Sequence, residues 1–213
     1  MNIIIIYSSV TGNTGRLAAY LREQLKVRGN DVGYFEAGKV AELLSECTGA
    51  PASAKSSVPE ELNSVSGGNK LPHSEKMRAS NPDSADIYIL AFWCRRSSMD
   101  DRSRKVLGLL EGKKILAVGT IGGDAAGGYA LRVEENVRKE ISTRNDCLGV
   151  KVCQGAVNMA RIEQRRSLSE DDPHYVNDEK YERYVRNIGR PNEEDKKAVM
   201  RYLDGFTSTV FLM

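Results

Sequence analysis

The fold is decided by the first stretch of the chain, NIIIIYSSVTGNT, residues 2–14. Residues 2–7 are an uninterrupted apolar run, and a run without polar alternation predicts a strand that is buried on both faces, as in a parallel sheet. A polar loop, residues 8–14, follows this strand. Apolar residues then recur at helical spacing as far as Gly29, where the helix is expected to stop. Residues 31–35 predict a second strand, so the chain opens with one β-loop-α-β unit.

The alternation of strand and helix continues downstream of this unit. Apolar runs predict further buried strands over residues 87–93, 114–118 and 148–154. Because parallel strands need right-handed crossover connections, the pattern predicts an α/β fold with a doubly wound parallel sheet and helices on both faces. The signals for the remaining helices are a cap at Asp100 or Asp101, the spacing of Leu131, Val133, Val137 and Ile141, and the terminal stretch 193–206.

We expect a single domain over residues 1–213 with one long insertion. Residues 46–82 are rich in Ser, Pro and Gly, which indicates an irregular surface loop; a substrate lid or a partner-binding arm is the alternative. Residues 160–213 form a charged tail that ends in a helix. The mixed charge of this tail is typical of a solvated helix face.

The composition excludes several classes of protein. The chain has 213 residues, a formal net charge of +2 and only two histidines, so neither nucleic-acid binding nor a metal site is expected. No apolar run approaches the roughly 18 residues that span a bilayer, so we expect no membrane segment. The short apolar start lacks the basic leader and the cleavage site of a signal peptide. We therefore expect a cytoplasmic protein whose four cysteines are free thiols.

The loop of residues 8–14 has the composition of an anion site. It precedes a helix N-terminus, whose exposed N–H groups and positive dipole end favour an anion. Its hydroxyls and the amide of Asn13 add neutral donors, and Gly12 permits close approach of a ligand. No Lys or Arg lies within the loop, and the Walker and dinucleotide glycine patterns are absent. These features favour the phosphate of a resident cofactor; an ordinary polar loop with a Ser/Thr cap is the alternative.

This loop, SSVTGNT after an N-terminal strand, resembles the FMN phosphate loop of flavodoxins, which usually reads T/S-x-T-G-N-T. The resemblance extends over residues 1–36 and 86–155. It implies FMN as the cofactor and a five-stranded sheet in the order 2-1-3-4-5. The layout is also similar to a flavodoxin-like subfamily of anaerobic bacteria that includes a partner of bilirubin reductase. The segments that carry this second similarity are Phe92-Trp93, Gly119-Thr120, Cys153-Gln154-Gly155 and the charged tail.

In flavodoxins two further loops hold the isoalloxazine ring, and here they correspond to residues 93–99 and 120–129. The resemblance implies that Trp93 stacks on the ring; a place at the edge of the core is the alternative. Tyr129 is expected either to supply a second face or to open the next helix. The candidate cofactor-binding residues are Ser8, Ser9, Val10, Thr11, Gly12, Asn13, Thr14, Phe92, Trp93, Cys94, Arg95, Thr120, Ile121, Gly122, Gly123 and Tyr129.

The loop after the third strand departs from the flavodoxin pattern. It reads CRRSS and has no Gly, whereas flavodoxins usually place a Gly and acidic residues there. Positive charge from Arg95 and Arg96 beside a flavin would favour the anionic reduced form of that flavin. The alternatives are that the two arginines bind an acidic substrate or partner, or that they are only solvated.

The sequence therefore predicts an FMN-binding, flavodoxin-like redox protein that transfers electrons between protein partners. One alternative is an FMN-dependent NAD(P)H reductase of quinones or other small acceptors. Another is a cofactor-free interaction module on the same fold. No side chain is expected to act as a catalytic acid or base, because the flavin carries the chemistry. The expected partner is thus a redox partner protein or a small-molecule acceptor.

Overall fold

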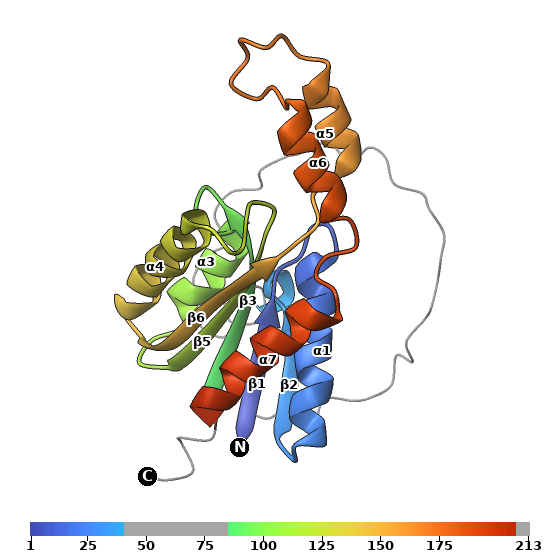
Figure 1. The fold of residues 1–213 in the computed structure, drawn as a ribbon. Coiled ribbons are helices and arrows are strands. Elements are labelled where there is room, and N and C mark those ends of the chain that lie inside the picture. Colours follow the sequence, from blue (N-terminus) through green and yellow to red (C-terminus); the bar gives the residue numbers. More distant parts are fainter. Residues whose placement is uncertain (41–84, 208–213) are drawn as a thin grey trace.

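The computed structural model describes residues 1–40 and 85–207, and Figure 1 shows a central sheet with helices packed around it. Five parallel strands lie in the order β2-β1-β3-β5-β6, which confirms the predicted doubly wound sheet and its order. The insertion expected over residues 46–82 lies outside the described residues. The strands are β1 (Asn2–Tyr7), β2 (Asp31–Glu36), β3 (Ile87–Arg95), β5 (Lys114–Ile121), β6 (Asp146–Gln154) and a two-residue β4 (Ser98–Met99), antiparallel to the end of β3.

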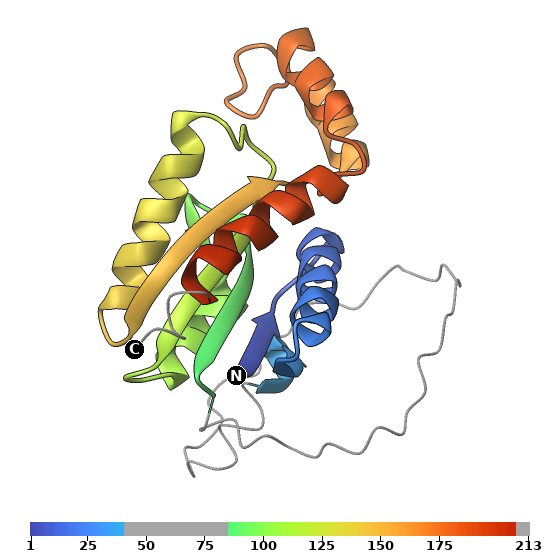
Figure 2. The same cartoon turned by 60° about the horizontal axis from the view of Figure 1, so that its bottom comes forward.

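The lack of alternation in β1 reflects burial on both faces of the sheet. Ile3 and Ile5 pack on one face with α1 (Asn13–Val27) and α7 (Glu193–Thr207). Ile4 and Ile6 pack on the other with α3 (Asp101–Leu109) and α4 (Gly128–Ser142). All four isoleucines are at most 3% exposed. The sheet therefore separates two hydrophobic cores, each covered by its own helices (Figure 2).

Two predicted elements differ in extent from the observed ones. The sequence predicts that the strand ends at residue 118, but residues 119–121 continue β5 and pair with β6. The close approach of the Phe92 ring explains the glycine at 119, since a Cβ there would lie 2.4 Å from Phe92 Cζ. Leu131, expected on the buried face of α4, is 68% exposed because Val133 and its helical neighbours fill that face instead.

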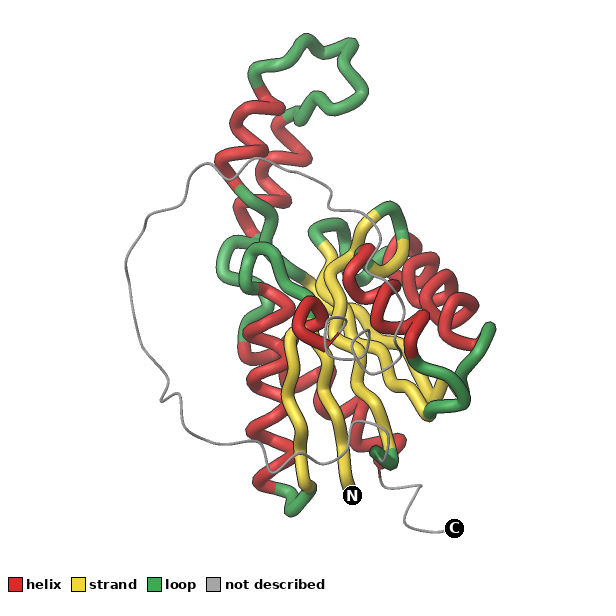
Figure 3. Tube along the Cα trace, turned by 180° about the vertical axis from the view of Figure 1, so that it is seen from behind, coloured by secondary structure: helices red, strands yellow, loops and turns green. Residues whose placement is uncertain are grey.

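The part of the charged tail that precedes α7 folds into two short helices that stand away from the sheet, as Figures 1 and 3 show. These are α5 (Met159–Arg166) and α6 (Asp178–Arg186), which we call the α5–α6 hairpin. Tyr181 donates a 2.6 Å hydrogen bond to Glu163, and Arg166 both pairs with Asp178 and lies 4.1 Å from the Tyr181 ring centroid. The hairpin projects from the edge where the parallel strands end, next to the loop that follows β1 (Figure 1).

None of the helices in the described part of the chain is long and apolar enough to cross a membrane. Within the same residues, no three His, Cys, Asp or Glu side chains gather in a way that could hold a metal ion.

Candidate functional site

A cavity of about 500 Å³ opens at the carboxyl ends of the strands, the edge where ligands bind in open α/β sheets. Its walls come from the loop after β1, the ends of β3 and β5, the start of α4, and residues 155–165. Eleven of the sixteen predicted residues line it: Val10, Thr11, Asn13, Thr14, Trp93, Cys94, Thr120, Ile121, Gly122, Gly123 and Tyr129.

The loop after β1 ends in an open helix N-terminus. Gly12 is the N-cap of α1, has a left-handed φ of 83°, and brings no side chain to cap the first turn. The Ser9 hydroxyl is buried and has no hydrogen-bond partner among the described residues. A buried polar group without a partner is unfavourable, and an oxyanion would supply the missing partner. The loop therefore fits the phosphate that the sequence predicts for it.

The side chain of Ser8 forms a hydrogen bond within the protein. Its side chain is buried, and its hydroxyl donates a 2.8 Å hydrogen bond to Asp100. Asp100 is the N-cap of α3 and also accepts from the Ser103 hydroxyl at 2.8 Å and from the Trp93 N–H at 3.4 Å. The sequence indicated only the capping role of Asp100. In the structure this carboxylate fixes the end of β1, the end of β3 and the start of α3 relative to one another.

The side chains of Asn13 and Thr14 form hydrogen bonds with other residues of the protein. Asn13 Nδ2 donates to the carbonyl of Ala156 at 2.7 Å, and its Oδ1 accepts from Arg16 at 3.0 Å. The Thr14 hydroxyl lies 2.9 Å from that of Thr120. Within the loop, Thr11 is thus the exposed hydroxyl that lines the cavity.

Trp93 and Tyr129 border the opposite part of the cavity. Trp93 is half-buried, and its Nε1 has no hydrogen-bond partner in the described part of the chain. Tyr129 is the second residue of α4, one of the two positions that the sequence left open, and it also lines the cavity. Its hydroxyl lies 3.4 Å from Cys94 Sγ. Burial raises the pKa of both groups above its usual value, which leaves them neutral near pH 7.

The five predicted residues that are not among the lining residues of the cavity are Ser8, Ser9, Gly12, Phe92 and Arg95. Phe92 is fully buried in the core against Gly119. Arg95 pairs with Asp101, at the start of α3. Arg96 is exposed and has a φ of 50° in the turn between β3 and β4. Neither arginine of this turn lines the cavity.

The chain matches the family model of the flavodoxin domain over residues 43–203. The chain belongs to the flavodoxin domain family. Membership of this family indicates FMN as the cofactor, as the loop after β1 predicted. The matched range begins after that loop, so the fit of the loop to a phosphate depends on its own geometry.

The relatives of this flavodoxin domain are distant. It is 32% identical over 92 residues to the flavodoxin-like domain-containing protein BilS of Clostridioides difficile (strain CD3). The matched region covers 42% of this chain and 52% of BilS, so the chain spans about half the length of that relative. A two-electron reduced flavodoxin of Megasphaera elsdenii is 17% identical, with a TM-score of 0.42 over 70% of this chain and 84% of its own. Oxidised flavodoxin 1 of Bacillus cereus is 13% identical, with a TM-score of 0.42 over 87% and 93%.

The flavodoxin domain has a cavity wall that the sequence did not indicate. Arg161, Ile162 and Arg165 of α5, together with Tyr184 of α6, line the cavity. The spacing of the two arginines places them on one face of a helix, but nothing in the sequence links that helix to the loop after β1. The link is a tertiary contact, the hydrogen bond from Asn13 to Ala156 just before α5.

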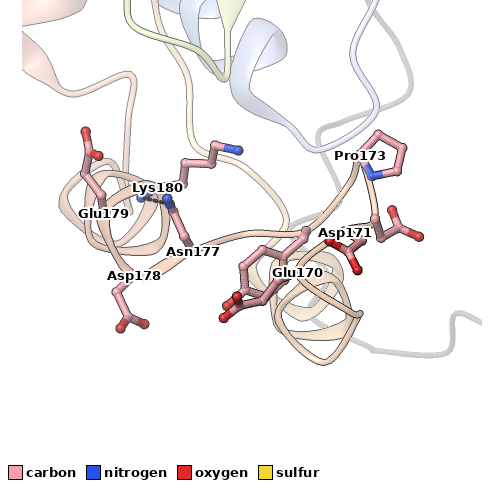
Figure 4. Close-up of a pocket in the computed structure, with 9 residues that line it drawn as sticks. Glu170, Asp171, Pro173, Asn177, Asp178, Glu179 and Lys180 are labelled. Atoms are coloured by element: carbon pink, nitrogen blue, oxygen red, sulfur yellow. Dashed lines mark hydrogen bonds between the residues drawn. The ribbon is translucent and has the colours of Figure 1, made fainter.

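A second hollow lies near the tip of the α5–α6 hairpin and is acidic. Glu170, Asp171, Asp178 and Glu179 are among its lining residues. Figure 4 shows these carboxylates pointing in different directions, without a common centre. This arrangement fits solvated surface charges, and the hollow is not part of the candidate site.

Proposed function

We propose that this flavodoxin domain binds FMN in the cavity at the strand ends and transfers electrons between protein partners. The observation that carries the proposal is the loop after β1. It combines a glycine-capped helix N-terminus with the buried hydroxyl of Ser9, which has no hydrogen-bond partner among the described residues. The cavity that continues from this loop is bordered by Trp93 and Tyr129, two aromatic side chains suited to a planar ring.

Some residues of the cavity bind the phosphate of FMN, and others cover its ring. The N–H groups of the first turn of α1 and the hydroxyl of Thr11 hold the phosphate. Trp93 covers the ring and offers its indole N–H as a donor. Cys94 and Tyr129 are neutral near pH 7 and add no charge at that wall. FMN, when bound, supplies the redox chemistry, so the protein needs no acid or base.

We also propose that the chain belongs to the flavodoxin-like subfamily that contains BilS, based on the partial match to that protein. The partners are redox proteins, with small-molecule acceptors as the alternative. The cytoplasmic location expected from the sequence stays a prediction.

The test is to load the purified protein with FMN and to mix it, without oxygen and without a partner, with NADH or NADPH. We expect the flavin absorbance to persist, because an electron carrier needs a partner reductase. Direct bleaching by a nicotinamide would contradict the carrier proposal and support the reductase. A protein that stays colourless with added FMN would contradict both and support the interaction module.

A further inference from the structure

Two arginines of α5 give the cavity a charge that nothing in its wall balances. Arg161 and Arg165 are one helical turn apart, and both line the cavity. They are the only charged residues among the described residues that line it; no Asp or Glu does. The whole chain, by contrast, is nearly neutral, with 31 Lys and Arg against 29 Asp and Glu.

Neither guanidinium group has an ion-pair or hydrogen-bond partner within residues 1–40 and 85–207. The neighbouring Arg166, by contrast, pairs with Asp178 and lies over the ring of Tyr181, both in α6. Like charges at positions i and i+4 of a helix repel each other. An anion bound between Arg161 and Arg165 would remove that repulsion and would form charge-assisted hydrogen bonds.

Contacts at its start and toward α6 fix the position of α5, whose residues Arg161, Ile162 and Arg165 line the cavity. Asn158 caps the helix by accepting the backbone N–H of Arg161 at 3.3 Å, and Ile162 is buried. On the side of α6, Glu163 accepts from Tyr181. The helix begins beside the N-terminus of α1, because Asn13 holds Ala156 at 2.7 Å.

We propose that Arg161 and Arg165 form an anion-binding pair that takes an oxyanion, a phosphate or a carboxylate, inside the cavity. This inference rests on the proposed function in that it concerns the same cavity. The oxyanion has two possible sources: the phosphate of FMN or an acidic group of a small electron acceptor. In the first case the cofactor phosphate is held by two charges as well as by the neutral loop.

The first arm of the test compares FMN with riboflavin, which lacks the phosphate. The Arg161→Gln/Arg165→Gln double variant is set against a matched control, Lys180→Gln/Arg186→Gln, which removes the same charge from α6 outside the cavity. Dissociation constants are measured by flavin fluorescence. If the pair binds the cofactor phosphate, the first variant binds FMN about tenfold or more weakly, with riboflavin affinity unchanged, and the control matches the wild type.

The second arm needs no flavin. Inorganic phosphate is added to the cofactor-free protein, and the midpoint of thermal unfolding is compared with that in chloride at equal ionic strength. We expect phosphate to raise the midpoint of the wild type and of the control, but to raise that of the Arg161→Gln/Arg165→Gln variant less. If phosphate raises the midpoint of the double variant less than that of the wild type, and the FMN affinity of the variant is unchanged, the pair binds an acidic group of a small electron acceptor.

The two proposals fail in different ways. If the Arg161→Gln/Arg165→Gln variant has the same FMN affinity and the same phosphate-dependent rise in unfolding midpoint as the wild type, the proposal of an anion-binding pair is overturned, whether or not the protein binds FMN. If the wild type binds neither flavin, the proposed function is overturned, and the phosphate arm still decides whether the pair binds an oxyanion.

Discussion

Asp100 is the residue that joins the strand ends behind the cavity. It is 1% exposed and accepts hydrogen bonds from Ser8, Trp93, Arg102 and Ser103. We expect Asp100→Ala to lower the free energy of unfolding by at least about 2 kcal/mol, because it removes a helix cap and leaves buried donors unpaired. Urea denaturation measures this loss. Asp100→Asn, which keeps one acceptor, should lose less; equal stability of Asp100→Ala and the wild type would contradict the role of this network.

Thr11 provides the cleanest single test of the phosphate loop. Its side chain is exposed in the cavity, whereas those of Asn13 and Thr14 are bonded within the protein. Thr11→Val removes one hydrogen bond to a charged group, and we expect a loss of roughly 1.5–3 kcal/mol in FMN binding, about ten- to a hundredfold in affinity. Thr143→Val, at the C-cap of α4 and away from the cavity, is the control. Equal FMN affinity of both variants would remove Thr11 from the site.

The labelling of two free thiols, Cys94 and Cys147, can be compared within one chain to test where FMN binds. Both are half-buried, and burial raises the pKa of both thiols, but only Cys94 lines the cavity. Since the thiolate is the reactive form, labelling of both thiols by iodoacetamide should still accelerate at a pH well above the ordinary thiol pKa, where an unperturbed thiol has levelled off. We expect FMN to slow the labelling of Cys94 and not that of Cys147, measured by mass spectrometry. Equal protection of the two thiols would place the flavin elsewhere.

The central strands and the loop after β1 could be predicted from local sequence, for a physical reason. A strand that is buried on both faces must be apolar along its length, and β1, β3 and β5 show this directly. The end of β5 was placed too early because a glycine in a strand looks like a loop. What keeps Gly119 in the strand is the ring of Phe92, a contact between elements.

The packing of β3 against β5 predicts a specific cost at Gly119. Gly119→Ala would place a Cβ 2.4 Å from Phe92 Cζ, and the fully buried ring has little room to move. We expect a destabilisation of about 1–3 kcal/mol, measured by urea denaturation. Gly108→Ala in α3 meets no atom within 4 Å and should instead stabilise by about 0.5–1 kcal/mol. A neutral Gly119→Ala would show that β3 and β5 are less tightly packed than this.

The α5–α6 hairpin could not have been assigned to the site from sequence. Its mixed charges indicate a solvated helix, and most of α5 is indeed exposed. Which face of α5 is turned toward the cavity depends on tertiary contacts. These contacts bury Ile162 and place Arg161 and Arg165 in the cavity wall, and the local sequence does not distinguish these residues from their neighbours. For the same reason, the sequence drew attention to Arg95 and Arg96, whereas the arginines that line the cavity are Arg161 and Arg165.

At the scale of the whole molecule, one sheet has a hydrophobic core on each face and a cavity at the carboxyl ends of its strands. The cores lie on opposite faces of the sheet, and the cavity lies at the strand ends, under the hairpin. A ligand that binds this edge contacts the loop after β1, the ends of β3 and β5, and α5 at once. Binding should therefore stabilise the folded chain by about 2.7 kcal/mol at a ligand concentration of a hundred dissociation constants.

The most direct test of the central claim is a titration of the cofactor-free protein with FMN, followed by flavin fluorescence and by the midpoint of thermal unfolding. We predict saturation at one FMN per chain, together with a midpoint that rises as FMN is added. The absence of saturable binding, with an unchanged midpoint, would contradict the claim that the cavity at the strand ends is a flavin site.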